Sequence, residues 1–471
     1  MRKTKIVCTI GPATEGKEQL RALADAGMDV ARLNFSHGSH EWHGERIRLL
    51  REIERERGRP IAIHQDLCGP KLRIGQVPDE GIELPRGSEC LLSTEPFAPG
   101  PVPRIPIPLP GLLEALQPGG LVYMDDAQIE MDVTEKSDAG VRCLVRHGGL
   151  LRSRKGVTAP GASFQIDALT EKDLADAAFA IREGIDYIGV SFVRRASDMD
   201  PVHRLIADAG SAARVIAKIE KPEAITYLDE ILAACDGLMV ARGDLGVEVP
   251  LHQVPVLQKQ IIRACVNTGK PVITATQMME SMIKSPRPTR AEVSDVANAV
   301  YDGTSAVMLS GETAMGDFPV ETVRAMAATA EYAEAHLPYA QLLREALNRD
   351  AVGRTEALCQ GVTEIATDLG VAAILCSTTS GETARQFARM RPALPIIAAT
   401  ANTATYRSLA LSWGVQPLLV PETTVVEERV AALLDGARAR GWVTPGQTVA
   451  IAAGATVGTA GGTTAFRIEA V

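Results

Sequence analysis

The fold class follows from residues Val215–Asp244, which read VIAKIEKPEAITYLDEILAACDGLMVARGD. This segment holds two short aliphatic runs, Val215–Glu220 and Gly237–Ala241, and each carries polar residues at its carboxyl end. Nearly continuous apolar runs of this length are typical of parallel strands whose two faces are both covered. The segment therefore predicts part of an alternating α/β protein.

The same alternation runs through most of the first 330 residues. Eight strand candidates with helical patterns between them predict a closed (β/α)8 barrel, the TIM barrel. The helical patterns include Glu18–Ala26, His43–Arg57, Glu171–Glu183 and Val256–Thr268. The strand candidates are Lys5–Ile10, Met28–Phe35, Ile61–Leu67, Tyr187–Val193, Val215–Glu220, Gly237–Ala241, Pro271–Thr276 and Ala306–Ser310.

Two further regions depart from this alternation. Between Leu72 and about Lys155 the helical signal vanishes, and short alternating runs punctuated by Pro and Gly predict a small β-barrel domain inserted after the third barrel strand. Such an insertion lies over the C-terminal mouth of the barrel, where it can act as a lid. From about residue 340 a second α/β pattern predicts a C-terminal domain with a mostly parallel sheet. The expected domains are 1–70 with 157–338 for the barrel, 71–156 for the lid and 339–471 for the C-terminal domain.

Length, charge and cysteine usage narrow the class of protein. The chain has 471 residues, which is too long for one hydrophobic core and favours two to four domains. Its net charge of −9 argues against nucleic acid or an anionic membrane as partner. No run resembles a secretory signal or a membrane span, and eight cysteines without CxxC spacing suggest free thiols in a reducing compartment. We therefore expect a cytoplasmic protein.

The two strands of the opening segment carry the first candidate site. Lys218 and Glu220 are spaced i, i+2, so both side chains point to one face of their strand. The next strand ends in Arg242-Gly243-Asp244, and neighbouring strands could bring Glu220 and Asp244 close enough to share a Mg²⁺ ion. A lysine beside a metal suits phosphoryl transfer, in which catalysis is mostly positioning and charge stabilisation. A lone KxE is more often a solvated ion pair, and the Arg-Gly-Asp turn after the second strand favours the functional interpretation.

The second strand adds Arg32, Asn34 and Ser36, again on one face if the strand continues. Arg32 has a planar fork suited to phosphate. The oxygens of Asn34 and Ser36 could hold a monovalent cation, with Asp66 completing the cluster. His37 is interpreted as a neighbour of a nucleotide, not as a general base. An exposed arginine followed by a polar turn is an equally open alternative.

Three further candidates stand at strand ends. Lys71 and Arg73 follow the Gly69-Pro70 turn and place positive charge at the hinge of the lid, although a basic surface hinge would look the same. Thr276 could orient substrate or a proton-relaying water, because a threonine is too weak an acid to donate a proton unaided.

The C-terminal domain contains a possible phosphate site at a helix N-terminus, in ILCSTTSGETARQFA. Because Ser and Thr also cap helices routinely, a structural role is nearly as well supported. A site in a separate domain suggests regulation. Its residues are Ser377, Thr378, Thr379, Ser380, Gly381 and Thr383.

Taken together, these segments resemble the pyruvate kinase family from end to end. The resemblance covers the whole chain, including the order of the motifs, the inserted β domain and the C-terminal domain. Its motifs are KIVCTIGPAT, DVARLNFSHG, DLCGPKLR, AKIEKPEAI, DGLMVARGDLGVEVP, VITATQMMESM and SPRPTRAEVSDVANAVYDGTSAVMLSGETAMGDFPVE.

The resemblance implies transfer of the phosphoryl group of phosphoenolpyruvate to ADP, the last step of glycolysis, with Mg²⁺ or Mn²⁺. It also implies a homotetramer and a possible phosphorylated allosteric effector. The implied catalytic residues are Lys218, Arg32, Thr276 and Arg73. The implied metal ligands are Glu220 and Asp244, and the backbone of Ala241, Arg242, Gly243 and Asp244 would hold the substrate carboxylate. The implied nucleotide neighbours are Pro12, Asn34, His37 and Arg73.

The sequence departs from the pattern of many family members in two segments. Many family members have an acidic residue at the position of Lys71 and a threonine-lysine pair at the positions of Leu67-Cys68. Those members need K⁺ near the positions of Asn34, Ser36, Asp66 and Leu67. The ammonium of Lys71 could supply that charge, so we expect K⁺ not to be required. Ala127 follows Asp125-Asp126 where the family usually has glycine, which puts the lid turn in doubt.

Two other functions fit parts of the pattern. A metal-dependent aldolase or lyase acting on pyruvate or oxaloacetate would also use a Glu/Asp metal pair, but it needs neither Lys218 nor Arg32 nor a lid. A catalytically inactive, effector-sensing relative would lack some of the expected catalytic residues, and all of them are present.

Overall fold

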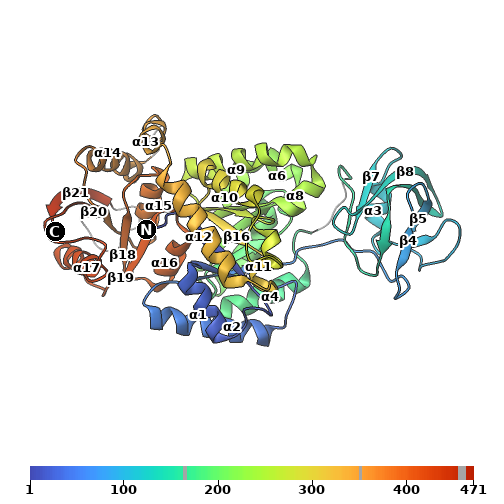
Figure 1. Cartoon of the computed structure of the whole chain (residues 1–471), viewed down its shortest axis with the longest axis horizontal. Coiled ribbons are helices and arrows are strands. Elements are labelled where there is room, and N and C mark those ends of the chain that lie inside the picture. The colour runs from blue at the N-terminus through green and yellow to red at the C-terminus, as the bar shows by residue number, and fades with distance from the viewer. Residues whose placement is uncertain (163–166, 350–352, 455–462) are drawn as a thin grey trace.

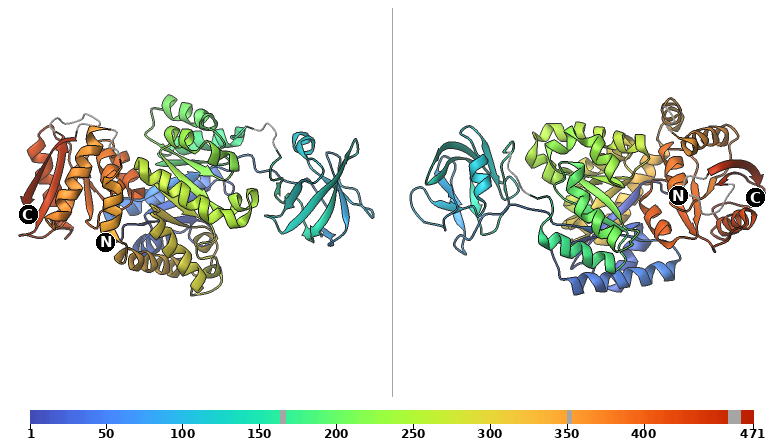
Figure 2. Two further views of the ribbon diagram at one scale, coloured as in Figure 1. Left: turned by 90° about the horizontal axis from the view of Figure 1, so that it is seen from above. Right: turned by 180° about the vertical axis from the view of Figure 1, so that it is seen from behind.

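The computed structural model describes residues 1–162, 167–349, 353–454 and 463–471. Its three parts lie in a row, with the barrel in the middle, the C-terminal domain at one end and the inserted β domain at the other (Figure 1). The β domain stands away from the barrel, as all views show (Figure 2). No helix in these ranges is both long and apolar enough to cross a bilayer.

The eight predicted barrel strands all form, and they close into a parallel barrel in the order β1-β16-β15-β14-β13-β12-β3-β2. Apolar side chains including Val7, Ile216 and Met308 fill its interior, and Ala410 and Leu411 of the C-terminal domain belong to the same buried cluster. The strands are β1 (Lys5–Ile10), β2 (Val30–Asn34), β3 (Ala62–Asp66), β12 (Tyr187–Val190), β13 (Arg214–Ile219), β14 (Gly237–Ala241), β15 (Val272–Ala275) and β16 (Ala306–Leu309).

Helices surround the barrel and pack on the outward side chains of its strands. Two of them begin with a capping box, in which each of two side chains accepts a hydrogen bond from the backbone amide of the other residue. The pairs are Thr170 with Asp173 and Thr289 with Glu292. The helices are α1 (Lys17–Ala26), α2 (His40–Arg57), α4 (Glu171–Arg182), α5 (Asp200–Asp208), α6 (Pro222–Thr226), α7 (Leu228–Ala234), α8 (Arg242–Glu248), α9 (Val254–Thr268), α10 (Arg290–Asp302), α11 (Gly311–Ala314) and α12 (Pro319–Ala335), with short 3-10 turns η1 (Ala196–Met199), η2 (Leu251–Gln253) and η3 (Glu280–Ile283).

The inserted β domain follows β3, as predicted, and has its own buried core. One sheet has the order β11-β7-β8-β9-β5-β6, and β10 pairs with β4. A short helix, α3 (Pro110–Ala115), was not expected; it buries Leu112 and Leu113 and is too short to show a helical period in the sequence. The strands are β4 (Ile82–Leu84), β5 (Glu89–Ser93), β6 (Arg104–Pro106), β7 (Leu121–Met124), β8 (Ile129–Ser137), β9 (Gly140–His147), β10 (Gly149–Leu151) and β11 (Val157–Thr158).

The C-terminal domain is a five-stranded sheet between helices, with a buried cluster on each face. Its order is β19-β18-β17-β20-β21, in which only β21 is antiparallel. The strands are β17 (Ile374–Ser377), β18 (Ile396–Thr400), β19 (Val415–Leu419), β20 (Thr448–Gly454) and β21 (Thr463–Ala470). The helices are α13 (Tyr339–Leu347), α14 (Arg354–Asp368), α15 (Glu382–Arg389), α16 (Thr403–Ser408) and α17 (Val426–Ala439), with the 3-10 turn η4 (Leu409–Leu411).

The two added domains lie at opposite ends of the barrel (Figure 1). The chain enters the β domain from the carboxyl end of β3, whereas Arg214 at the amino end of β13 contacts the C-terminal domain. The polar residues at the carboxyl ends of the barrel strands therefore face the inserted domain.

Candidate active site

Lys218 lies at the centre of a buried polar cluster at the carboxyl ends of β13, β12 and β3. Its ammonium Nζ is 2.8 Å from Oε1 of Glu220, on the same face of the strand. It is also 3.0 Å from Oδ1 of Asp66 and 2.7 Å from Oγ of Ser191. The structure thus brings Asp66 of β3 beside Lys218 and Glu220 at the end of β13, although the two strands are far apart in the sequence.

Burial and neighbouring charges act in opposite directions on the pKa of each member of this cluster. Burial alone would lower the pKa of Lys218, but Asp66 and Glu220 outweigh it, and the pKa lies above the usual range of a lysine. Burial works to raise the pKa of Asp66, but Lys218 and Arg32 hold it well below its ordinary value. Burial raises the pKa of Glu220 to about 7, because Lys218 compensates only in part. Glu220 is therefore the member of the cluster that most needs a further cation.

Arg32 on β2 completes the positive side of the cluster. Its Nε and Nη2 contact Oδ2 of Asp66 at 2.7 and 2.6 Å, and its Nη1 donates to Oγ1 of Thr9 at 2.8 Å. Three of the five N–H donors of the guanidinium are thereby engaged, and two remain for a ligand.

The side-chain oxygens that were expected to hold a monovalent cation make other contacts in the structure. Both oxygens of Asp66 face protein cations, as described above. Oδ1 of Asn34 accepts from the backbone amide of Ser36 at 3.1 Å, and the side chain of Ser36 is exposed. In this conformation Asp66 therefore serves the arginine and the lysine, while Asn34 orders the turn after β2.

Asp244 stands in the first turn of α8, directly after β14. Its charge raises the pKa of both Lys218 and Glu220, so the carboxylates of Asp244 and Glu220 interact. Asp244 also lines a cleft of about 460 Å³ between barrel and lid, together with Lys71 and Asp126. Two carboxylates completed by substrate oxygens and water are a usual Mg²⁺ site, and a buried carboxylate with a raised pKa fits such an ion. Among the described residues no cluster of three or more His, Cys, Asp or Glu could hold a metal.

Thr276 is held in a strained backbone conformation at the end of β15. Its φ of 67° is in the left-handed region, which costs about 1–2 kcal/mol for a residue with a side chain. Its Oγ1 accepts from the backbone amide of Gly243 at 2.9 Å and donates to the carbonyl of Ala275 at 2.6 Å. The side chain of Arg242 clamps the same turn through the carbonyl of Ala275, at 3.1 Å, and Asp295, at 2.8 Å. Only the backbone of Arg242 is thus free to serve a substrate.

The candidates at the lid hinge lie outside the Lys218 cluster. Nζ of Lys71 is 3.3 Å from Asp126 in the lid, and Nη1 of Arg73 donates to the carbonyl of Arg154 at 3.0 Å. Leu67 is buried, and its carbonyl accepts from Ser191 at 2.7 Å.

The remaining nucleotide candidates are on loops at the barrel mouth. Pro12 and His37 are exposed, and the carbonyl of His37 contacts Nε2 of His43 at 2.8 Å. In the turn after β7, Asp125, Asp126 and Ala127 all have positive φ, between 52° and 66°, so Ala127 adopts a conformation that favours glycine.

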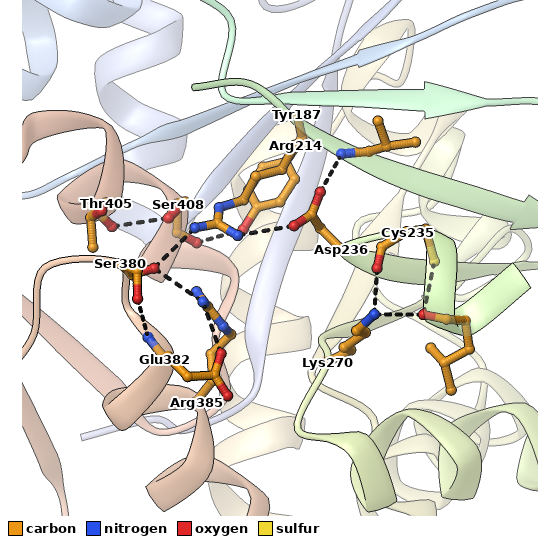
Figure 3. Close-up of polar contacts among 12 residues, drawn as sticks. Tyr187, Arg214, Cys235, Asp236, Lys270, Ser380, Glu382, Arg385, Thr405 and Ser408 are labelled. Carbon is orange, nitrogen blue, oxygen red and sulfur yellow. Dashed lines mark hydrogen bonds and ion pairs between the residues drawn. The ribbon is translucent and has the colours of Figure 1, made fainter. Parts of the chain in front are cut away.

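The loop that precedes α15 contacts the barrel, as Figure 3 shows. The carbonyl of Ser380 accepts from Arg214 and from Arg385, both at 3.0 Å. Within the loop, Oγ1 of Thr378 accepts from the amide of Gly381 at 2.9 Å. Of the predicted effector residues with side chains, Ser377, Thr378 and Thr383 are buried, Ser380 is half-buried and Thr379 is exposed. The N-cap of α15 is Gly381, which has no capping side chain, and Thr379 is the side chain most open to a ligand.

Sequence reasoning missed Ser191, Thr9 and Phe192. Ser191 contacts Lys218, Thr9 contacts Arg32, and the amide of Phe192 donates to Oε2 of Glu220 at 2.7 Å. The criterion that identified Thr276, a polar residue at the end of an apolar strand, would have found both hydroxyls. The contact of Phe192 involves only its backbone, so no sequence signal could have shown it.

Comparison with known proteins is consistent along the whole chain. Residues 1–323 match the family model described as "Pyruvate kinase, barrel domain", and residues 356–469 match "Pyruvate kinase, alpha/beta domain". The pyruvate kinase of Geobacillus stearothermophilus is 46% identical over 473 aligned positions, which cover all of this chain and 80% of that protein. The pyruvate kinase of Clostridium acetobutylicum is 39% identical, with full coverage of both chains. That of Staphylococcus aureus strain MRSA252 is 43% identical, covering all of this chain and 81% of the relative.

Proposed function

Since the chain belongs to the pyruvate kinase family and is an enzyme that transfers the phosphoryl group of phosphoenolpyruvate to ADP, we propose that this transfer takes place at the Lys218 cluster. The observation that carries this assignment is the buried contact of Lys218 with Glu220 and Asp66, beside Arg32. The negative charge on a transferring phosphoryl group must be stabilised by cations. Here an ammonium and a guanidinium lie beside a carboxylate that could bind a metal ion.

Arg32 holds the phosphate of phosphoenolpyruvate with its two free N–H donors. Lys218 stands beside the transferring phosphoryl group and stabilises the charge on its oxygens as the bond to the enol oxygen breaks. Both cations are fixed by Asp66 before substrate binds, so little reorganisation is needed during the reaction. This pre-organisation is the main contribution of the chain to the chemistry.

Glu220 and Asp244 would hold the divalent cation, which is Mg²⁺ or Mn²⁺. When bound, the ion neutralises negative charge on phosphate oxygens and orients them. The raised pKa of Glu220 supports this assignment, because a second cation would keep the buried carboxylate ionised.

The remaining part of the substrate is placed at the β14 and β15 ends. The backbone of Ala241–Asp244 holds the carboxylate, and Thr276 lies beside the enolate, where it orients substrate or a proton-relaying water. Thr276 is fixed for this role by Gly243, although the amide of Gly243 must exchange that contact to bind a carboxylate.

The nucleotide would lie between the barrel mouth and the lid, near Pro12, Asn34, His37 and Arg73. Closure of the lid would exclude water that could hydrolyse the transferred group. Lys71 would then leave Asp126 and supply the positive charge that K⁺ supplies elsewhere in the family, so K⁺ is not required.

Three further features belong to the same proposal. The functional units are 1–70 with 157–338, 71–156 and 339–471, assembled as a homotetramer. The loop 377–383 binds a phosphorylated effector, with Thr379 exposed for contact. The location is cytoplasmic, which agrees with eight free thiols.

A coupled assay of ATP formation from phosphoenolpyruvate and ADP tests the assignment. Glu220→Gln and Asp244→Asn should each lower kcat by at least about 10²-fold at saturating Mg²⁺, as expected for loss of a charged transition-state contact. The matched control is Asp435→Asn, which removes an exposed carboxylate of α17 and should leave kcat unchanged. Near-normal activity of both variants would place the metal elsewhere.

The same assay in Na⁺-only and K⁺ buffers tests the monovalent cation. Equal rates support the role of Lys71, and strong activation by K⁺ contradicts it. Titration with sugar phosphates and AMP, in the wild type and in Thr379→Ala, tests the effector loop.

A further inference from the structure

Ser191 occupies a specific place in the Lys218 cluster that no sequence motif indicated. It directly follows β12, which lies between β13 and β3 in the barrel, and it is 1% exposed. Its Oγ donates to the carbonyl of Leu67 at 2.7 Å. The same oxygen accepts from Nζ of Lys218 at 2.7 Å. Since the only hydroxyl proton is engaged by Leu67, a lone pair of Oγ is left to face the ammonium.

Ser191 makes a directed hydrogen bond with Lys218, whereas Asp66 and Glu220 contact it as ion pairs. A lysine ammonium has three N–H donors and no acceptor. Nζ has three oxygen neighbours within 3.0 Å, from Ser191, Asp66 and Glu220. Two of these are carboxylates, which hold the charge, and the third is neutral. Because Oγ of Ser191 is neutral, it orients the ammonium without contributing a negative charge to the cluster.

The same segment also touches the hinge of the lid. Gly69 packs so closely that a Cβ there would lie 2.9 Å from Cβ of Ser191 and 2.8 Å from Cδ2 of Phe192. The amide of Phe192 donates to Glu220 at 2.7 Å, and its φ of 54° shows a constrained turn. Ser191 and Phe192 thus join two residues of the proposed catalytic cluster to the chain segment that leads into the lid.

We propose that Ser191 is a positioning residue for Lys218, which ties the ammonium to the Leu67 carbonyl at the base of the lid hinge. This inference rests on the role of Lys218 in the proposed function. Without Ser191, one donor of a buried ammonium loses its partner, and the ammonium moves toward Asp66 and Glu220, away from the phosphoryl group. A displacement of about 1 Å can lower a rate about 10²-fold, so a loss of ten- to hundredfold in kcat is expected.

The alternative is that Ser191 is an ordinary buried hydroxyl whose loss affects only stability. Three variants separate the two roles in the coupled ADP-to-ATP assay. Ser191→Ala removes the acceptor, Ser191→Cys keeps the shape with a weaker acceptor, and Ser305→Ala is a control. Ser305 is also a buried serine of the barrel, 3% exposed, at the opposite end from the cluster.

For Ser191→Ala we expect a ten- to hundredfold lower kcat, with KM for phosphoenolpyruvate within about threefold and a thermal midpoint close to that of Ser305→Ala. Ser191→Cys should lie between Ser191→Ala and the wild type in kcat. A kcat within twofold of wild type for Ser191→Ala would overturn the proposal. If Ser191→Ala does not fold, Ser191→Cys decides: a kcat at least threefold below wild type supports the proposal, and a kcat equal to that of the wild type overturns it.

A double-variant cycle shows whether Ser191 acts through Lys218. In a Lys218→Arg background, Ser191→Ala should lower kcat by less than threefold, because the ammonium that Ser191 orients is gone. A full additional ten- to hundredfold loss would contradict action through Lys218. If the wild type makes ATP and Lys218→Arg is impaired while Ser191→Ala is not, only this inference fails, and the proposed function stands.

Discussion

Replacing Lys218 by methionine tests the electrostatic design of the site through stability as well as activity. Methionine keeps the length and the apolar stem of the side chain but removes the charge. Asp66 would still have Arg32 at 2.6 Å, whereas Glu220 would have only the amide of Phe192 at 2.7 Å. The energetic cost therefore falls on Glu220.

Removing one partner of a buried ion pair costs about 3–5 kcal/mol when the other charge is left uncompensated. Glu220 can escape part of this cost, because its pKa is already raised to about 7 and it can take up a proton. We therefore expect Lys218→Met to lose about 2–3 kcal/mol of unfolding free energy at pH 8.

The sign of the pH dependence follows from linkage. Loss of Lys218 raises the pKa of Glu220 further in the folded state than in the unfolded state, so the folded variant binds more protons near neutral pH. Its stability relative to wild type then falls as pH rises, and the loss at pH 6 should be smaller than at pH 8. The double variant Lys218→Met/Glu220→Gln removes the unpaired charge and should regain about half of the loss.

Urea unfolding measures these differences, with the fluorescence of Trp42 on α2 reporting on the barrel. Lys284→Met is the control, because this lysine is 75% exposed and its partner Asp317 is 56% exposed. It should change stability by less than about 1 kcal/mol. These expectations are refuted if Lys218→Met is as stable as Lys284→Met at both pH values, or if Glu220→Gln destabilises it further.

Three other predictions concern the lid turn, the domain junction and the hinge. Ala127→Gly should stabilise the lid by about 0.5–1 kcal/mol, because φ is 66° at this position and glycine adopts such a φ without strain. Slower amide hydrogen exchange in β7 and β8 would show this stabilisation, and unchanged exchange would contradict it. Arg391 is buried with its pKa lowered to about 9, chiefly by burial, and no carboxylate in the described ranges is within ion-pair distance. Arg391→Met should therefore gain about 1 kcal/mol at pH 7 in urea unfolding, because it removes a buried charge; a loss of stability would refute this. Lys71→Glu should make the rate in Na⁺ at least about tenfold lower than in K⁺, a difference of about 1.4 kcal/mol in activation free energy, and equal rates would exclude a cation role for Lys71.

Elements with a strong local pattern were predicted closely. The bounds of β1 and β14 agree residue for residue with the aliphatic runs, since buried parallel strands need no polar alternation. Helix α3 was missed because six residues cannot display a period of 3.6, and its formation depends on burying Leu112 and Leu113 in the lid core. Ser191 was missed because its importance lies in a contact with another strand.

The amino-acid sequence by itself determined the barrel, the place of the insertion and the pairing of Lys218 with Glu220, because strand periodicity and i, i+2 spacing act over a few neighbouring residues. Only the tertiary structure decided that Asp66 and Ser191 complete the environment of Lys218, that Arg242 clamps β15, and that Lys71 contacts Asp126. These contacts depend on barrel closure and on the position of the lid, which bring together groups 27 to 152 residues apart. At such separations the geometry is set by packing of the whole domain, and local sequence carries no record of it.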